Sequence, residues 1–137
     1  MKELTVDAKR ENLLQAQAFI DEELETADCP MLTQIAIDVA VEELFVNIAS
    51  YAYGPKTGTA TIQVMNDPGT NSVSITLSDS GIPYDPLARE DPDVTLPAEK
   101  RGIGGLGIYM VKQSMDKVDY KHIDGRNFIT ITKNLDS

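Results

Sequence analysis

The most informative part of the sequence is Val39-Ala-Val-Glu-Glu-Leu-Phe-Val-Asn-Ile-Ala-Ser-Tyr-Ala-Tyr53. It is apolar at most positions, and on a helix it places Glu43 and Asn47 on the same face, about one turn apart. A buried carboxylate must be paired or neutralised, whereas an exposed carboxylate is solvated by water. We expect Glu42 to be exposed and solvated. Four apolar residues are expected to shield Glu43 from solvent: Val39, Leu44, Val46 and Ile48. The surroundings of Glu43 and Asn47 therefore favour a functional pair.

Two helices are expected in the first half of the chain. Apolar residues recur at helical spacing over residues 11–27, with acidic residues between them, which is typical of an amphipathic surface helix. Asp28-Cys-Pro30 interrupts this pattern, and Pro30 suits the first position of a second helix over residues 30–53. The second helix is apolar on most sides, so we expect it to be the central and most buried one. Its main apolar stripe comprises Ile37, Val41, Leu44, Ile48 and Tyr51.

Alternation of apolar and polar residues predicts the strands. A short one is expected around Leu4 and Val6, and a turn at Asn66–Gly69 joins two more over residues 60–64 and 73–77. After a third helix at residues 106–115, two last strands at residues 117–122 and 127–133 flank an Asp124-Gly125 hairpin turn. The order βααββαββ predicts an α+β fold, a two-layer α/β sandwich with a mixed, mostly antiparallel sheet covered by about three helices.

Residues 84–101 differ in character from the rest of the chain. They carry Pro86, Pro92 and Pro97 among charged residues and have neither helical nor strand periodicity. A stretch of this length inside a compact domain is uncommon, and it is usually a functional lid or a disordered segment.

A glycine-rich sequence follows, Gly102-Ile-Gly-Gly-Leu-Gly107. It satisfies the pattern G-x-G-x-x-G, but that pattern indicates a dinucleotide site only directly after a strand, which is not the case here. The sequence G-x-x-x-x-G-K-[ST] does not occur, so a P-loop is excluded. Two interpretations remain: a flexible hinge with close helix packing, or glycines that let the backbone approach phosphates at a helix N-terminus.

Two further motifs concern a base pocket. Asp79-Ser-Gly-Ile-Pro83 ends an apolar strand, and ordinary turn chemistry explains it when it is taken alone. The alternative is a carboxylate that accepts a hydrogen bond from an adenine amine, with Gly81 letting the base lie against the backbone. Thr130 and Thr132 share one side of the last strand, which usually reflects strand propensity, although one of these hydroxyls would be able to close such a pocket.

Composition limits the classes of function. The chain has 137 residues, enough for one domain, and its 22 acidic against 12 basic residues give a net charge of −10. Such a charge disfavours direct nucleic-acid binding. The single cysteine, Cys29, suits a reducing cytosol, and the N-terminus lacks the apolar segment of a signal peptide, so we expect a cytoplasmic protein with no membrane association.

Taken together and in this order, the E-x-x-x-N helix, the D-x-G-x-P turn and the glycine-rich sequence resemble the Bergerat-fold (GHKL) ATP-binding superfamily. Within it, the chain looks most like the anti-sigma-factor serine kinases of bacterial partner-switching systems, and the resemblance covers nearly the whole sequence. Sensor histidine kinases of this fold need an attached phospho-acceptor helix, and gyrase-like and mismatch-repair relatives carry further domains. A single ATP-binding kinase domain over residues 1–137 fits the anti-sigma group better.

The resemblance implies a role for several residues. Glu43 matches the general base, and Asn47 matches the ligand of Mg²⁺. Asp79 matches the anchor of adenine, and Gly81 shapes the turn beneath the base. Thr130 is the better candidate for the threonine that lies near adenine in the family.

The same resemblance makes residues 84–101 the ATP lid. Lys100 and Arg101 stand at its end, where their charge suits contacts with phosphates. In the family a histidine often stands eight residues after the glutamate, and this chain has Tyr51 there. The implied nucleotide-binding residues that follow the lid are Gly104, Gly105, Leu106 and Gly107.

The activity implied is transfer of the γ-phosphate of ATP, with Mg²⁺, to a serine of a STAS-domain anti-sigma antagonist. A sigma factor would be a second, mutually exclusive partner, and the family also commonly forms homodimers. Two alternatives remain open: a non-catalytic ATP-binding partner-switch module, and a simple ATPase in which water replaces serine. The presence of Glu43 favours catalysis over binding alone.

Overall fold

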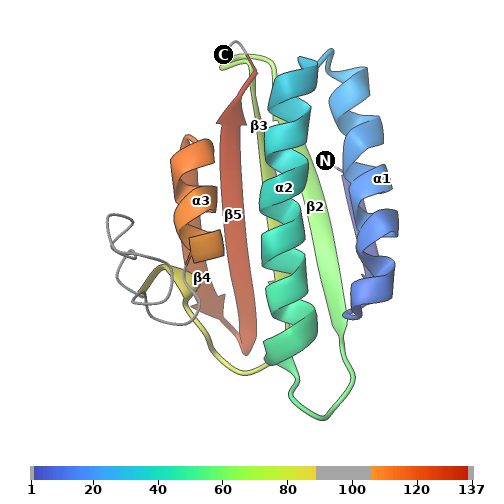
Figure 1. The fold of residues 1–137 in the computed structure, drawn as a ribbon, viewed down its shortest axis with the longest axis vertical. Helices are drawn as coiled ribbons and strands as arrows, with labels where there is room; N and C mark the ends of the chain where they lie inside the picture. Colours follow the sequence, from blue (N-terminus) through green and yellow to red (C-terminus); the bar gives the residue numbers. More distant parts are fainter. Residues whose placement is uncertain (1, 89–105, 136–137) are drawn as a thin grey trace.

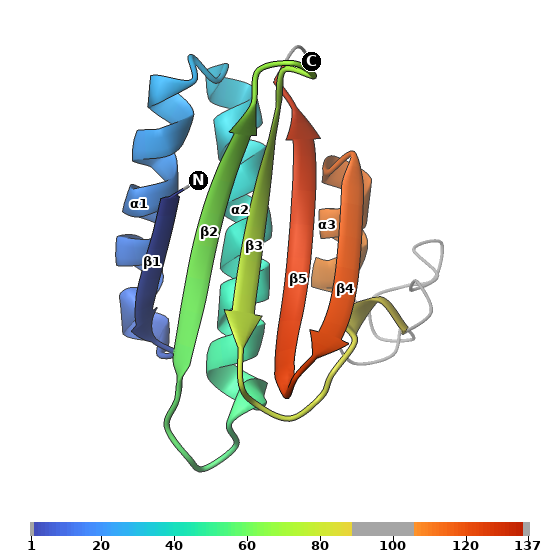
Figure 2. The ribbon, with the colours of Figure 1, turned by 180° about the vertical axis from the view of Figure 1, so that it is seen from behind.

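The computed structural model describes residues 2–88 and 106–135. Three helices lie side by side on one face of a five-stranded sheet, and the other face of the sheet has no helix on it (Figures 1 and 2). The fold is therefore the predicted two-layer α+β sandwich. In chain order the elements are β1 (Lys2–Asp7), α1 (Leu13–Thr26), α2 (Met31–Asn47), β2 (Thr59–Asp67), β3 (Ser72–Asp79), α3 (Leu106–Ser114), β4 (Lys117–Ile123) and β5 (Arg126–Asn134).

The strands are arranged in the order β1-β2-β3-β5-β4, and each neighbouring pair is antiparallel. The prediction of a mixed sheet is thus corrected to a fully antiparallel one among the described strands. Strand β5 lies between β3 and β4, because the β4–β5 hairpin places its second strand inward (Figure 2). The register of β3 and β5 sets Asp79, the last residue of β3, opposite Asn127.

The core lies between the sheet and the helices. Alternate residues of the strands point toward the helices, as the period of a strand requires, and meet the apolar sides of α1 and α2. Burial of each such side chain contributes roughly 1.5–3 kcal/mol. The largest fully buried residues are Ile20, Leu24, Ile37, Val41, Phe45, Ile62, Val64, Val73, Ile75, Leu77 and Ile131.

Helix α2 is central, as predicted, but it is not buried on most sides. Leu32 is 83% exposed and Val39 is 57% exposed, because the sheet lies beneath α2 and its opposite side faces solvent. Tyr51, which the sequence assigns to the buried stripe, is 65% exposed. The sequence shows that α2 is apolar on most of its sides. It does not show which of those sides faces solvent in the folded protein.

The end of α2 is tied to the turn that follows β3. The helix continues as a π-helix over Ile48–Ala52, a local form that is frequent at functional sites. The carbonyl oxygen of Ala52 accepts a hydrogen bond of 2.8 Å from the backbone N–H of Ile82. The hydroxyl of Tyr53 donates to the carbonyl of Thr59 and accepts from the backbone N–H of Ser80. These bonds hold the last turn of α2 against the Asp79 turn.

The two hairpins agree with the sequence to different degrees. Asp124 and Gly125 both have positive φ, 52° and 78°, as a two-residue hairpin turn of this kind requires, so that prediction is confirmed. The β2–β3 turn lies later than predicted, because β2 continues to Asp67 and the positive φ of 49° falls at Asn71. Among residues 2–88 and 106–135, no helix has the length and apolar character needed to cross a membrane.

Candidate functional site

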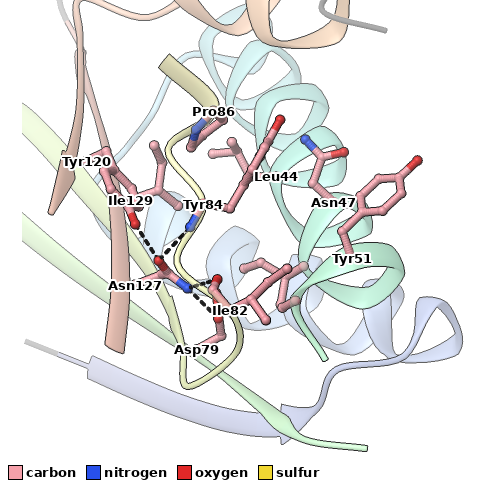
Figure 3. Close-up of a pocket in the computed structure, with 12 residues that line it drawn as sticks. Leu44, Asn47, Tyr51, Asp79, Ile82, Tyr84, Pro86, Tyr120, Asn127 and Ile129 are labelled. Atoms are coloured by element: carbon pink, nitrogen blue, oxygen red, sulfur yellow. Dashed lines mark hydrogen bonds between the residues drawn. The ribbon is translucent and has the colours of Figure 1, made fainter. Parts of the chain in front are cut away.

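A pocket opens between the end of α2, the end of β3 with the segment that follows it, the middle of β4 and the start of β5 (Figure 3). Asn47 and Tyr51 lie on the side formed by α2, and Asp79, Tyr84 and Asn127 lie on the opposite side. The cavity has a volume of about 80 Å³ and apolar walls. Its remaining lining residues are Leu44, Ile48, Ala52, Ile82, Pro86, Tyr120 and Ile129.

Asp79 is the buried acid of this pocket, with 4% of its surface exposed. Its Oδ1 accepts a hydrogen bond of 2.9 Å from the backbone N–H of Gly81 and one of 3.0 Å from Nδ2 of Asn127. The first of these is the turn chemistry expected of Asp-Ser-Gly. The carboxylate therefore shapes its turn and lines the pocket at the same time, so the two interpretations of the motif are compatible.

Asn127, the first core-facing residue of β5, connects the walls of the pocket. Its Nδ2 donates to Asp79 and to the carbonyl oxygen of Ile82, and its Oδ1 accepts from the backbone N–H of Tyr84 and from the hydroxyl of Tyr120 (Figure 3). Every donor hydrogen and both acceptor positions of the amide are thus used. Sequence reasoning missed this residue. Its spacing from Ile129 and Ile131 was the available signal, since alternate residues of a strand share a face.

The assignment of Thr130 to the neighbourhood of adenine is wrong. Ile129 and Ile131 are buried in the core, so Thr130, which lies between them on the strand, points to the face of the sheet that has no helices. There its hydroxyl hydrogen-bonds that of Thr76, at 2.8 Å. Asn127 is the polar residue of β5 that lines the pocket.

Glu43 and Asn47 line different hollows. Asn47 borders the pocket, whereas Glu43 lines a groove of about 430 Å³ between α2 and α3. Glu43 is half-buried, and the prediction that Val39 shields it from solvent is wrong, because Val39 lies exposed on the rim of this groove. Within residues 2–88 and 106–135, neither Glu43 nor Asn47 has a side-chain hydrogen bond.

Two glycines sit where a larger residue would collide with the site. A Cβ at Gly107 would lie 2.1 Å from Cδ of Glu43, so the first turn of α3 packs directly against that carboxylate. A Cβ at Gly81 would lie 2.1 Å from the carbonyl oxygen of Ala52. Gly81 therefore allows the Asp79 turn to approach the end of α2. This close approach is the physical reason why glycine is needed in the turn.

Several predicted residues lie outside the described part of the chain. They are most of the proposed lid together with Lys100, Arg101, Gly104 and Gly105. The described part of the lid contains a 3-10 turn, Pro86–Ala88, whose Pro86 lines the pocket. Leu106 begins α3, as the sequence predicted.

A model of the family described as "Histidine kinase-like ATPase domain" matches residues 6–133. This match covers nearly the whole chain. The chain belongs to the histidine kinase-like ATPase domain family. Membership in an ATPase family implies that the domain binds ATP, and the pocket that contains Asp79 is the candidate site.

Individual relatives agree with this assignment. The serine/threonine-protein kinase BtrW of Bordetella bronchiseptica is 26% identical over 99 residues, which cover 72% of this ATPase domain and 69% of BtrW. The structure of the RsbU and RsbW domains of a Mycobacterium tuberculosis protein aligns with 98% of the chain at a TM-score of 0.63 and 16% identity. The blue-light activated histidine kinase of Erythrobacter litoralis aligns with 79% at a TM-score of 0.57 and 17% identity.

The solved structures share the fold of this ATPase domain. The chain spans 33% of the length of the Mycobacterium tuberculosis chain and 32% of that of the Erythrobacter litoralis kinase. The similarity therefore concerns the ATPase domain and not the other parts of those proteins.

Proposed function

We propose that the chain is a protein serine kinase that transfers the γ-phosphate of ATP to a serine of a STAS-domain anti-sigma antagonist. We also propose that the chain sequesters a sigma factor in the cytoplasm, and that the antagonist and the sigma factor cannot bind at the same time. The kinase name of the relative BtrW supports this choice over other activities of the family.

One observation carries the proposal. The carboxylate of Glu43 lies against Gly107 in the first turn of α3, and Asn47 lies one turn further along α2 at the edge of the pocket. A helix N-terminus favours negative charge such as that of a phosphate. A nucleotide whose base lies near Asp79 would thus have its phosphates directed toward the groove that contains Glu43.

In the proposed reaction, Glu43 accepts the proton of the acceptor serine. A bond forms between the serine oxygen and the γ-phosphorus, and the bond between that phosphorus and the bridging oxygen of ADP breaks, so the electron pair leaves with ADP. Such transfers depend on positioning and on neutralised charge. The half-buried position of Glu43 beside an open groove leaves room for an acceptor hydroxyl.

The oxygen of Asn47 suits Mg²⁺, which prefers oxygen ligands and keeps bonds to phosphate and water. Residues 2–88 and 106–135 contain no cluster of three or more His, Cys, Asp or Glu side chains that would hold a metal without the nucleotide. Asn47 would contribute one oxygen ligand to such an ion. When bound, Mg²⁺ would neutralise part of the phosphate charge.

The experiment that tests the proposal is transfer of label from γ-labelled ATP to a STAS-domain protein of the same organism. Glu43→Gln is expected to lower the transfer rate about 10²-fold or more while leaving ADP affinity unchanged, because a positioned base contributes that much. Glu25→Gln, which removes the same charge from an exposed position on α1, is the matched control.

Other outcomes would replace the proposal. Release of free phosphate without labelling of the partner would indicate a simple ATPase. Nucleotide-dependent binding of the partner without any transfer would indicate a partner-switch module. Transfer that is unchanged in Glu43→Gln would remove Glu43 from the role of base.

A further inference from the structure

We infer that the groove between α2 and α3 is the docking surface for the protein substrate, and that its occupant is an amphipathic helix with a basic side chain beside the acceptor serine. The docked helix would present that serine to Glu43. The inference rests on the proposed function, because it concerns the surface that holds the substrate of that kinase.

The solvent side of α2 carries a stripe of exposed apolar side chains. Leu32 is 83% exposed, Val39 is 57% exposed and Ile35 is 52% exposed. At 3.6 residues per turn, Leu32, Val39 and Glu43 fall within about 40° of one another around the helix axis. The stripe therefore leads to Glu43 over about three turns, or roughly 16 Å. Exposed apolar side chains that gather on one surface mark interaction sites, whereas single ones do not.

The groove beside this stripe has the shape that a helix requires. Helices α2 and α3 lie side by side and form its two walls (Figure 1). Val39 lines the groove from α2, and Met110, which is 54% exposed, lines it from α3. Side-chain ridges of a third helix can pack between two such helices, with apolar anchors at helical spacing. Because Glu43 and Gly107 also line the groove, a helix that fills it reaches the proposed base directly.

The charge of the groove distinguishes between possible occupants. Its lining, taken over the described residues, includes Glu42 and Glu43 and no basic side chain, and the whole chain has a net charge of −10. Complementary charge accelerates association and disfavours wrong partners, so a basic side chain is expected near the serine of the substrate. A second copy of this chain would bring the same acidic groove, which disfavours this surface as a contact between copies.

The test is the steady-state kinetics of label transfer from ATP to the STAS-domain protein, with the double variant Leu32→Gln/Val39→Gln. The KM for the protein substrate is expected to rise about 10- to 100-fold, because two apolar anchors are lost. The kcat should stay within about twofold of the wild type, since a docking contact contributes equally to the ground state and the transition state. The KM for ATP should not change. Both positions are exposed and glutamine suits a helix, so the variant is expected to fold.

Three single variants separate the stripe from the rest of the surface. Met110→Gln, on the opposite wall, is expected to raise the KM for the protein substrate by about threefold to tenfold. Glu42→Gln is expected to raise it by about threefold at low salt and to have little effect at high salt, because the attraction is screened. The matched control is Leu14→Gln, which changes a side chain that is 77% exposed on α1, on the other side of α2 from α3 (Figure 1). It should change neither KM.

The outcomes distinguish this inference from the proposed function. An unchanged KM for the protein substrate in Leu32→Gln/Val39→Gln would overturn the docking surface and leave the kinase in place. If the same variant instead changed from dimer to monomer in analytical ultracentrifugation while that KM stayed unchanged, the stripe would be a contact between copies. A rise of the same size in Leu14→Gln would also overturn the docking surface. No labelling of the substrate by the wild type would overturn the proposed function and, with it, this inference.

Discussion

The Asp79 pocket and the Glu43 groove, which meet along α2, differ in how far the protein itself arranges them. In the pocket, Asp79 and Asn127 are buried and hydrogen-bonded to each other, to the turn that follows β3 and to Tyr120 of β4. In the groove, Glu43 is half-buried, has no side-chain hydrogen bond among the described residues, and lies near the exposed Val39 and Met110. The comparison indicates that the proposed base site is arranged before any ligand binds, whereas the geometry of the proposed transfer depends on what binds.

The largest effect is expected on the groove side, from Gly107→Ala. The new Cβ would displace the carboxylate of Glu43, and misplacing a catalytic group by about 1 Å can cost roughly 10²-fold in rate. Stability should not fall, because the end of the Glu43 side chain can move aside and alanine favours a helix more than glycine by about 1 kcal/mol. Rates of phosphoryl transfer and thermal unfolding measure the two effects.

The matched control for this prediction is Gly69→Ala, in the β2–β3 turn, where a Cβ would meet only Oδ1 of Asp67 at 3.2 Å. A loss of ADP affinity in Gly107→Ala as large as the loss of transfer would contradict the separation of pocket and groove.

A smaller effect is expected where α1 packs against α2, away from both regions. Burial, a hydrogen bond with Asp21 and the charge of Asp21 raise the pKa of Asp38 from 3.8 to about 7. Oδ1 of each of these carboxylates is buried without a partner among the described residues. Between these pKa values the folded state binds more protons than the unfolded state, so stability declines as the pH rises from about 4 to about 7.

Asp38→Asn is expected to reduce this decline by about 1 kcal/mol, after allowance for the partial exposure of the group. Urea unfolding at about pH 4 and about pH 8 measures it, with Asp7→Asn at the exposed end of β1 as the control. Nucleotide affinity at a single pH should not change. A pH dependence identical to that of the wild type would show that the raised pKa of Asp38 does not cause the decline.

The smallest effect is expected from Thr130→Val. The substitution removes the hydrogen bond to Thr76 on the far face of the sheet, and it should cost no more than about 1 kcal/mol of stability. Affinity for ADP should stay within about twofold of the wild type, because Thr130 does not border the pocket. A larger loss of ADP affinity would indicate that Thr130, and not Asn127, is the residue of β5 that contacts the nucleotide.

The sequence predicted those features that depend on local chemistry. The Asp124-Gly125 turn follows from residues that tolerate positive φ, and the spacing of Glu43 and Asn47 follows from the period of a helix. The order and type of the helices and strands were predictable because the period of a helix or a strand is also a local property. The position of the β2–β3 turn was missed because Asn66 and Asp67 continue β2 despite their turn propensity.

The features that were missed depend on contacts between distant segments. Asp79 faces Asn127 through the register of β3 and β5, two strands 48 positions apart along the chain at this pair, and no local pattern specifies that register. The close approach of Gly81 to Ala52 likewise depends on the π-helical end of α2. Thr130 was chosen by its side-chain type, and only the burial of Ile129 and Ile131 shows that it faces away.

The proposed nucleotide site is tested most directly by calorimetric titration of the purified chain with ADP in the presence and absence of Mg²⁺, repeated on Asp79→Ala. We expect magnesium-dependent binding of one ADP per pocket and at least about 10²-fold weaker binding by Asp79→Ala, because a charged hydrogen bond and its buried partner are lost together. Equal affinity of the two proteins, or no binding of ADP by the wild type, would contradict it.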